Sequence, residues 1–203
     1  MFRSLIFIIL CIGNSLTLAD QTTKSILVIG DSISAAYGIR LDSGWVNLLA
    51  LQIAKEKHPY QVINASISGD TTINGVKRLA PLLKRHKVDI VIIELGGNDG
   101  LRGLSLKVMK KNLKTMIDMS QQAGASVLLA GMKIPPNYGK RYTQLVYKTY
   151  SDLSHEYKLP YIPFLLEGVG DKKELMQKDG LHPTQEAQVI ILNTVWNKLE
   201  QML

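Results

Sequence analysis

The sequence predicts an α/β fold, a three-layer α/β/α sandwich in which helices cover both faces of a sheet of about five parallel strands. Two features of the sequence predict it. Short, almost continuously apolar runs alternate with longer segments of helical period, and the connections between them are short. Continuous apolar runs are typical of parallel strands that are covered on both faces. Strand–helix alternation with short connections favours one parallel sheet.

Five short runs are the predicted strands, and five longer segments are the predicted helices. The strands span residues 25–29 (SILVI), 61–65 (QVINA), 90–95 (IVIIEL), 126–130 (SVLLA) and 159–164 (LPYIPF). The helices span residues 45–57, 72–85, 106–123, 141–157 and, at the end of the chain, 184–202. In the third helix one face is predicted to be buried, formed by Met109, Leu113, Met116, Ile117 and Ser120. Its methionines are expected to fill the core rather than to bind a ligand.

A secretory signal peptide is predicted over residues 1–19, followed by a single domain over residues 20–203. Arg3 is a short positive start, residues 5–12 are apolar, and a small residue precedes the expected cleavage site before Asp20. The apolar run is too short for the roughly 20 residues that cross a bilayer, although a retained membrane anchor is the alternative. The mature chain is therefore expected to be exported, periplasmic or secreted, without stable membrane insertion.

Composition excludes several classes of protein. A hydrophobic fraction of 46% and a charged fraction of 20% are those of an ordinary globular chain. The only cysteine, Cys11, lies in the predicted leader, which excludes a disulfide scaffold, a thiol nucleophile and a cysteine zinc site from the mature chain. The formal net charge of +7 includes Arg3 of the leader. Basic clusters such as residues 84–87 are short and lack interleaved aromatics, so no nucleic-acid partner is expected.

Ser32 is the first candidate site residue, in the stretch GDSIS after the first predicted strand. At a strand-to-helix turn its hydroxyl would point out of the sheet edge, and its N–H would lie at the positive start of a helix. The alternative is that Asp31 or Ser32 is an ordinary helix N-cap, which the local sequence alone favours. The flanking residues do not form the G-x-S-x-G elbow of the common α/β-hydrolases.

Asp179 and His182 form the second candidate, in the stretch DGLHP near the C-terminus. An acid and an imidazole three residues apart in one tight loop can reach one another through a hydrogen bond. The carboxylate would then fix the tautomer of the ring and leave the other ring nitrogen free to take a serine proton. Gly180 permits the turn, and Pro183 is expected to precede the start of the last helix.

Two further stretches follow predicted strands. Asn98, in GGNDG, has a side-chain amide that could donate to a developing oxyanion. A plain Gly/Asn turn is the alternative at that position. Gly69, in ISGD, would let a backbone N–H approach a substrate closely, as a second oxyanion donor. The loop over residues 133–139 follows another strand and is expected on the same ligand-binding edge.

Together these four stretches resemble the blocks of the SGNH, or GDSL, hydrolases. GDSIS carries Ser32, NASISGDT carries Gly69, ELGGNDGLRG carries Asn98, and DGLHPT carries Asp179 and His182. The resemblance runs from about residue 24 to the C-terminal helix.

The resemblance implies a flavodoxin-like fold and a serine esterase that hydrolyses esters and thioesters of medium or long acyl chains. Ser32 would be the nucleophile, His182 the base oriented by Asp179, and the oxyanion donors would be the N–H groups of Ser32 and Gly69 and the Asn98 amide. Substrate-binding residues are expected at Gly100, Leu101, Arg102, Gly103, Leu104, Ile134 and Pro135. No metal or organic cofactor is implied. The expected partner is a small acyl ester, thioester or lysophospholipid, and the chain is expected to be a monomer or a weak dimer.

Two alternatives stay open at this point. The first is a flavodoxin-like module that holds a phosphate or nucleotide without catalysis, but it does not explain the spacing of Asp179 and His182. The second keeps the site and changes the substrate to an acetylated sugar of the cell wall or another carbohydrate. Trp45 and Trp196 fall in helical segments where packing is expected, so they do not indicate a sugar-binding cleft.

Overall fold

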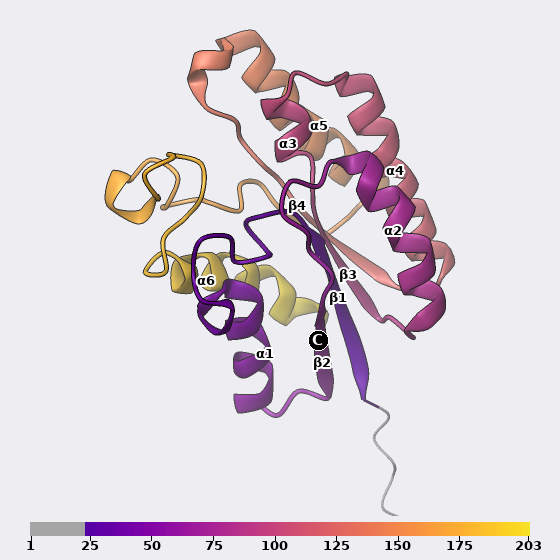
Figure 1. Ribbon diagram of the computed structural model, residues 1–203. Helices are drawn as coiled ribbons and strands as arrows, with labels where there is room; N and C mark the ends of the chain where they lie inside the picture. Colours follow the sequence, from indigo (N-terminus) through magenta and orange to yellow (C-terminus); the bar gives the residue numbers. More distant parts are fainter. Residues whose placement is uncertain (1–22) are drawn as a thin grey trace, which may run out of the picture.

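A five-stranded parallel sheet, in the order β2-β1-β3-β4-β5, organises the computed structural model, which describes residues 23–203 (Figure 1). The strands are β1 (Lys24–Gly30), β2 (Tyr60–Asn64), β3 (Ile90–Glu94), β4 (Ser126–Ala130) and β5 (Tyr161–Ile162). This strand order is the flavodoxin-like one. The expected fold class, a three-layer α/β sandwich, is confirmed.

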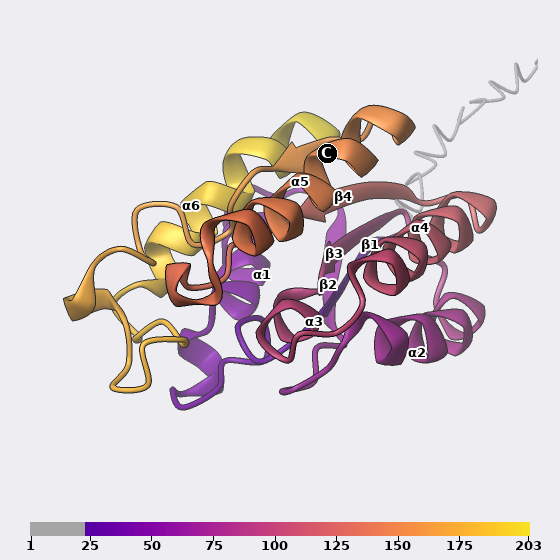
Figure 2. The same ribbon diagram turned by 90° about the horizontal axis from the view of Figure 1, so that it is seen from above.

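Six helices connect the strands and cover the sheet. They are α1 (Trp45–Lys55), α2 (Thr72–Arg85), α3 (Gly97–Leu101), α4 (Leu106–Gln122), α5 (Lys140–Tyr157) and α6 (Gln188–Leu199). α1 packs on α6 on one face of the sheet, and α2, α4 and α5 pack side by side on the other (Figures 1 and 2). Short 3₁₀ turns lie at 41–43, 136–138, 173–175 and 200–202.

The core lies in the central strands and the helix faces packed on them. The apolar residues of β1 and β3 are fully buried, as expected for strands covered on both sides. The predicted buried face of α4 is confirmed. Each of its five residues has an exposed fraction of 0%: Met109, Leu113, Met116, Ile117 and Ser120. Trp45 is also fully buried, in keeping with a packing role.

The predicted strand over 159–164 is a strand for only two residues. Pro160 and Pro163 flank Tyr161 and Ile162, and proline lacks the N–H that a sheet ladder needs. The ladder with β4 is therefore confined to the two residues between the prolines.

Two expected helix starts were wrong. Ser32 begins a series of turns over residues 32–38 instead of a helix, because Ala36 and Gly38 have left-handed φ values of 57° and 75° that break a helical path. The last helix starts at Gln188 rather than Thr184, whose backbone N–H donates to the Leu175 carbonyl.

One helix was not predicted. α3 occupies the GGNDG stretch that the sequence indicated only as a turn or loop. Gly96 has a left-handed φ of 113°, and a Cβ there would lie 2.4 Å from the Tyr150 hydroxyl, so only glycine fits the entry to this helix.

The predicted leader over 1–19, with Cys11, lies outside the described residues. Within residues 23–203, the helices are all too short or too polar to span a bilayer.

Candidate active site

The predicted site residues come from loops at the carboxyl edge of the sheet. Ser32 follows β1, Gly69 follows β2, and Asn98 lies in α3 directly after β3. His182 lies in the long loop between β5 and α6. Parallel strands deliver all these loops to one edge, where such sheets bind ligands.

Ser32, His182 and Asp179 form an unbroken series of hydrogen bonds. Ser32 Oγ lies 2.8 Å from His182 Nε2, and His182 Nδ1 lies 2.7 Å from Asp179 Oδ2. A carboxylate can only accept, so Nδ1 carries the ring proton and Nε2 accepts from the serine hydroxyl. This is the arrangement in which an imidazole can remove a serine proton.

The loop geometry holds Asp179 in place and keeps it charged. Its Oδ1 accepts the backbone N–H groups of Leu181 at 2.9 Å and His182 at 3.0 Å, while Oδ2 faces the imidazole. Partial desolvation opposes ionisation, but these hydrogen bonds outweigh it and lower the pKa of Asp179 to about 2. On the other side of the ring, Tyr37 packs with its centroid 4.5 Å from that of His182.

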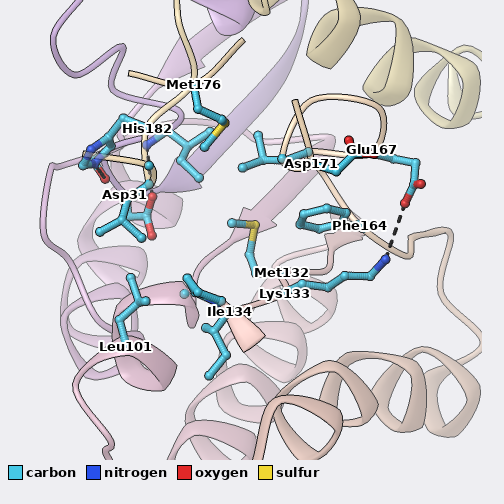
Figure 3. Close-up of a pocket in the computed structure, with 18 of the residues that line it drawn as sticks. Asp31, Leu101, Met132, Lys133, Ile134, Phe164, Glu167, Asp171, Met176 and His182 are labelled. Atoms are coloured by element: carbon cyan, nitrogen blue, oxygen red, sulfur yellow. Dashed lines mark hydrogen bonds and ion pairs between the residues drawn. The ribbon is translucent and has the colours of Figure 1, made fainter. Parts of the chain in front are cut away.

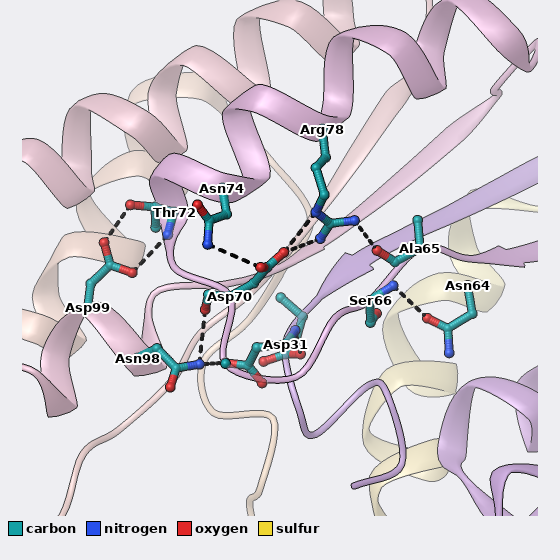
Figure 4. Close-up of polar contacts among 12 residues, drawn as sticks. Asp31, Asn64, Ala65, Ser66, Asp70, Thr72, Asn74, Arg78, Asn98 and Asp99 are labelled. Carbon is teal, nitrogen blue, oxygen red and sulfur yellow. Dashed lines mark hydrogen bonds and ion pairs between the residues drawn. The ribbon is translucent and has the colours of Figure 1, made fainter.

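The three predicted oxyanion donors differ in what surrounds them. Among the described residues, the backbone N–H groups of Ser32 and Gly69 have no protein acceptor. Both hydrogens of the Asn98 amide nitrogen have one. Nδ2 lies 3.0 Å from Asp31 Oδ2 and 2.9 Å from the Asp70 carbonyl oxygen (Figure 4). The amide is thereby fixed in one orientation.

Asp31 lies buried between the nucleophile turn and Asn98. Its Oδ1 accepts the Ile33 N–H at 3.1 Å, and its own N–H donates to Glu94 Oε2 at 3.2 Å. Burial raises the pKa of Asp31 to about 6, although the Ile33 N–H and the charge of His182 act in the opposite direction. Burial also raises the pKa of Glu94, and the Asp31 carboxylate beside it adds to this effect. The acid next to the serine is therefore part of a buried network.

Further carboxylates fix the two loops beside Asn98 (Figure 4). Asp99 accepts the Thr72 N–H at 2.8 Å and the Thr72 hydroxyl at 2.6 Å, which ties α3 to the start of α2. Arg78 binds the Asp70 carboxylate, with Nε 2.8 Å from Oδ2. The peptide whose carbonyl accepts from Asn98 is thus held on both sides.

A cavity of about 620 Å³ opens beside Ser32, Asn98 and His182 (Figure 3). Most of its lining side chains are apolar: Ile33, Leu101, Met132, Ile134, Pro135, Pro136, Phe164, Leu166, Met176 and Leu181. Of the predicted substrate-binding residues, three line this cavity, namely Leu101, Ile134 and Pro135. The structure places Gly100, Arg102, Gly103 and Leu104 outside that lining, and Arg102 donates instead to the Gly69 carbonyl at 2.9 Å.

Sequence reasoning missed the wall of the cavity opposite Ser32. Phe164 lines it beside Lys133, whose Nζ lies 4.6 Å from the ring centroid and 3.6 Å from Glu167 Oε2 (Figure 3). The 164–182 segment carries no motif before Asp179, so nothing in its sequence pointed to a binding wall. Asp31 was also missed as a site residue, although it stands next to Ser32.

Within residues 23–203, no group of three or more His, Cys, Asp or Glu side chains is arranged to hold a metal ion. The chemistry that these residues offer is proton transfer and hydrogen bonding around one hydroxyl.

Comparisons with known proteins agree with this geometry. Residues 28–190 match the GDSL-like Lipase/Acylhydrolase family. The chain is 44% identical over 193 residues to esterase TesA of Pseudomonas aeruginosa, which covers 95% of this chain and 96% of the relative. It is 37% identical over 188 residues to thioesterase 1/protease 1/lysophospholipase L1 of Escherichia coli K12, covering 93% and 89% of the two chains.

Among solved structures, the fold matches a crystal structure of the psychrotrophic esterase EstA from Pseudoalteromonas sp., in which the esterase is inhibited by monoethylphosphonate. The TM-score is 0.84 at 38% sequence identity, over 88% of this chain and 98% of that one.

Proposed function

The chain belongs to the GDSL-like Lipase/Acylhydrolase family, and on that premise we propose that it is a serine esterase whose nucleophile is Ser32. It is a hydrolase of ester bonds. One observation carries the assignment of roles: the hydrogen-bonded series from Ser32 through His182 to Asp179, beside an apolar cavity.

In the proposed reaction, Ser32 Oγ attacks the acyl carbonyl carbon while His182 Nε2 takes the hydroxyl proton. Asp179 stabilises the imidazolium that forms. The imidazolium then protonates the departing alcohol or thiol, and the acyl group stays on Ser32. Water then attacks the acyl carbon while giving a proton to Nε2. The imidazolium returns that proton to Ser32 Oγ as the bond between Oγ and the acyl carbon breaks, and the free acid leaves.

The oxyanion is proposed to bind the N–H groups of Ser32 and Gly69 and the Asn98 amide. The first two lack a protein acceptor among the described residues, which supports a role toward a ligand. At Asn98 the oxyanion would share or take over one of the two hydrogens now directed at Asp31 and Asp70. Because Asn98 is already held in one orientation, its amide does not have to be reoriented when charge develops.

Acyl esters and thioesters with medium or long chains are the proposed substrates, including lysophospholipids. The apolar lining of the cavity supports this choice, because it offers a chain of methylene groups a surface away from water. The name of the E. coli relative includes thioesterase and lysophospholipase activities, and its identity to this chain supports extending them here.

Export is proposed as well, from the leader over residues 1–19. Mass spectrometry of the protein recovered from the periplasm or medium should find Asp20 as the first residue. A mature chain that still begins at residue 1 would contradict this.

The test of the proposed chemistry is Ser32→Ala against Ser68→Ala, an exposed serine that lies next to Gly69. Turnover of p-nitrophenyl esters from acetate to palmitate should vanish in the first variant and persist in the second, with the circular dichroism spectrum unchanged in both. Residual turnover near the wild-type value in Ser32→Ala would reject Ser32 as the nucleophile.

A further inference from the structure

The positive charge of the chain is concentrated in one segment. Residues 100–151 contain nine lysines and arginines and a single acid, Asp118, a net charge of +8. All other residues together contain 15 basic and 16 acidic side chains, a net charge of −1. The whole formal charge of +7 therefore belongs to this segment.

The segment folds into one side of the molecule. It supplies α4 and residues 140–151 of α5, and these two helices pack against each other on the same face of the sheet (Figures 1 and 2). The last turns of α5 add two acids, Asp152 and Glu156. Seven of the nine basic residues lie on these two helices: Lys107, Lys110, Lys111, Lys114, Lys140, Arg141 and Lys148. The folded protein thus carries a basic face formed by α4 and α5, called here the α4–α5 face.

A groove of about 560 Å³ runs along this face, with leucines and lysines lining it together. Leu106 and Lys107 of α4 share the groove with Leu145 and Lys148 of α5. Its two carboxylates, Asp152 and Glu156, come from the last turns of α5 and pair with lysines at that end, as in Lys114 Nζ to Glu156 Oε1 at 2.8 Å.

Toward the beginning of both helices the charges are unpaired. Within the described part of the chain, Lys107 and Lys111 have no carboxylate within 4.0 Å, and both are exposed. They lie at i and i+4 on α4, so both point to the same side of that helix. A ligand with several negative charges would meet free ammonium groups there.

Large apolar side chains are exposed among these cations. Val108 is 48% exposed, Leu145 is 47% exposed and Leu104, just before α4, is 42% exposed. Apolar side chains interleaved with lysines are typical of surfaces that lie in a membrane interface. A nucleic acid would satisfy the charges but would leave these side chains in water.

The α4–α5 face adjoins the rim of the cavity. Leu101 and Pro136, which line the cavity, lie shortly before α4 and α5 in the chain. The Tyr142 hydroxyl, in the first turn of α5, donates to the Gly100 carbonyl at 3.1 Å and so ties the two regions together.

We propose that the α4–α5 face binds an anionic lipid surface, and that this binding brings the cavity to acyl substrates held in that surface. The second part of the statement rests on the proposed function, whereas the first does not. Lysines supply the attraction to the lipid phosphates, and Val108 and Leu145 enter the interface.

Vesicle sedimentation with the full mature chain tests the proposal. Vesicles of phosphatidylcholine with phosphatidylglycerol should bind the protein, pure phosphatidylcholine vesicles should bind it far less, and added salt should weaken the binding. Ser32→Ala should bind as the wild type does, so a failure of the esterase assignment would show in turnover and leave vesicle binding unchanged.

The decisive variant is Lys107→Glu with Lys111→Glu. Its matched control is Lys55→Glu with Lys198→Glu, two exposed lysines on α1 and α6, in the opposite layer, with an identical change in net charge. The first pair should weaken binding to anionic vesicles at least about 30-fold, and the control pair no more than about threefold. Val108→Ser with Leu145→Ser should weaken binding without reducing its dependence on salt.

The two lysine pairs and the Val108→Ser with Leu145→Ser variant should keep wild-type turnover of p-nitrophenyl acetate, a soluble substrate, which also shows that they fold. Equal losses from the two lysine pairs would overturn the proposal, because net charge alone would then explain the binding. So would absence of binding to anionic vesicles, or binding to a DNA duplex that exceeds vesicle binding and is lost in the same variant.

Discussion

Asp179 and Asp31 are two carboxylates beside the same candidate site, one partly exposed to solvent and the other buried. Each accepts a backbone N–H and the side chain of a candidate catalytic residue, His182 for Asp179 and Asn98 for Asp31. The Asp179 side chain is 40% exposed and its pKa is lowered to about 2, whereas Asp31 is 3% exposed and its pKa is raised to about 6.

The difference shows which task suits each setting. The imidazolium of His182 forms only during the reaction, and it needs a partner that is charged throughout. Asp179 is partly exposed, so keeping its carboxylate ionised costs little desolvation free energy. A buried carboxylate is expensive, and Asp31 is held by two donors that only an acceptor at both oxygens can satisfy. We therefore expect Asp179 to act on proton transfer and Asp31 to act on the orientation of Asn98.

The largest expected effect is that of Asp179→Asn. The asparagine oxygen can still accept the Leu181 and His182 backbone N–H groups, so the loop is expected to persist. Its amide would then donate to Nδ1 and force the proton onto Nε2, which could no longer accept from Ser32. Steady-state kinetics should show kcat about 10³–10⁴-fold lower. A loss of less than tenfold would show that Asp179 does not set the tautomer.

Asn98→Ala should follow in size, with kcat about 10²–10³-fold lower and KM little changed. The reason is the loss of one oxyanion donor, which acts in the transition state and not in the ground state. An unchanged kcat would remove Asn98 from the oxyanion site.

Asp31→Asn should lower kcat less, by about tenfold. It should also lower the free energy of unfolding by about 1–3 kcal/mol, because either the Ile33 N–H or the Asn98 amide loses its buried acceptor. If Asp31 acts through Asn98, the double variant with Asn98→Ala should be little slower than Asn98→Ala alone. Ser34→Ala is the control: it removes a buried hydrogen bond to Glu94 in the same turn, without touching Asn98. Its effect on kcat should add fully to that of Asn98→Ala.

The effect on stability against pH should have opposite signs for the two carboxylates. The raised pKa of Asp31 gives stability that is complete below its ordinary value of 3.8 and is lost as the pH rises to about 6. The lowered pKa of Asp179 gives stability that is present above 3.8 and is lost as the pH falls to about 2.

Urea unfolding at intervals from pH 2.5 to 7 measures both contributions. Asp31→Asn should flatten the curve between pH 4 and 6, by at most about 3 kcal/mol. Asp179→Asn should flatten it below pH 4 by a smaller amount, because solvent screens a half-exposed carboxylate. Flattening of both variants in the same pH range would contradict the comparison.

How far the sequence could predict the molecule depends on how local each signal is. The strands and α4 follow from apolar runs and a buried face that neighbouring residues define, and they agree with the structure to within a few residues. Ser32, Asn98 and His182 stood out because each follows a strand or forms a close pair with an acid. The structure brings Ser32 and His182 together across 150 positions of sequence.

What was missed depends on contacts between distant segments. Phe164, Leu166 and Met176 form a wall of the cavity, and they belong to a long loop whose sequence has no periodic pattern. The role of Asp31 depends on Asn98, which is 67 residues away in the chain. Such partners can be identified only once the strands are placed in order.

The two prolines around β5 have a consequence for the protein in solution. β5 is the last strand in the order of the sheet, and Pro160 and Pro163 confine its pairing to Tyr161 and Ile162. An outer edge with so few free N–H groups cannot template a strand from another molecule. On this side the fold resists growth into the stacked sheets of an aggregate.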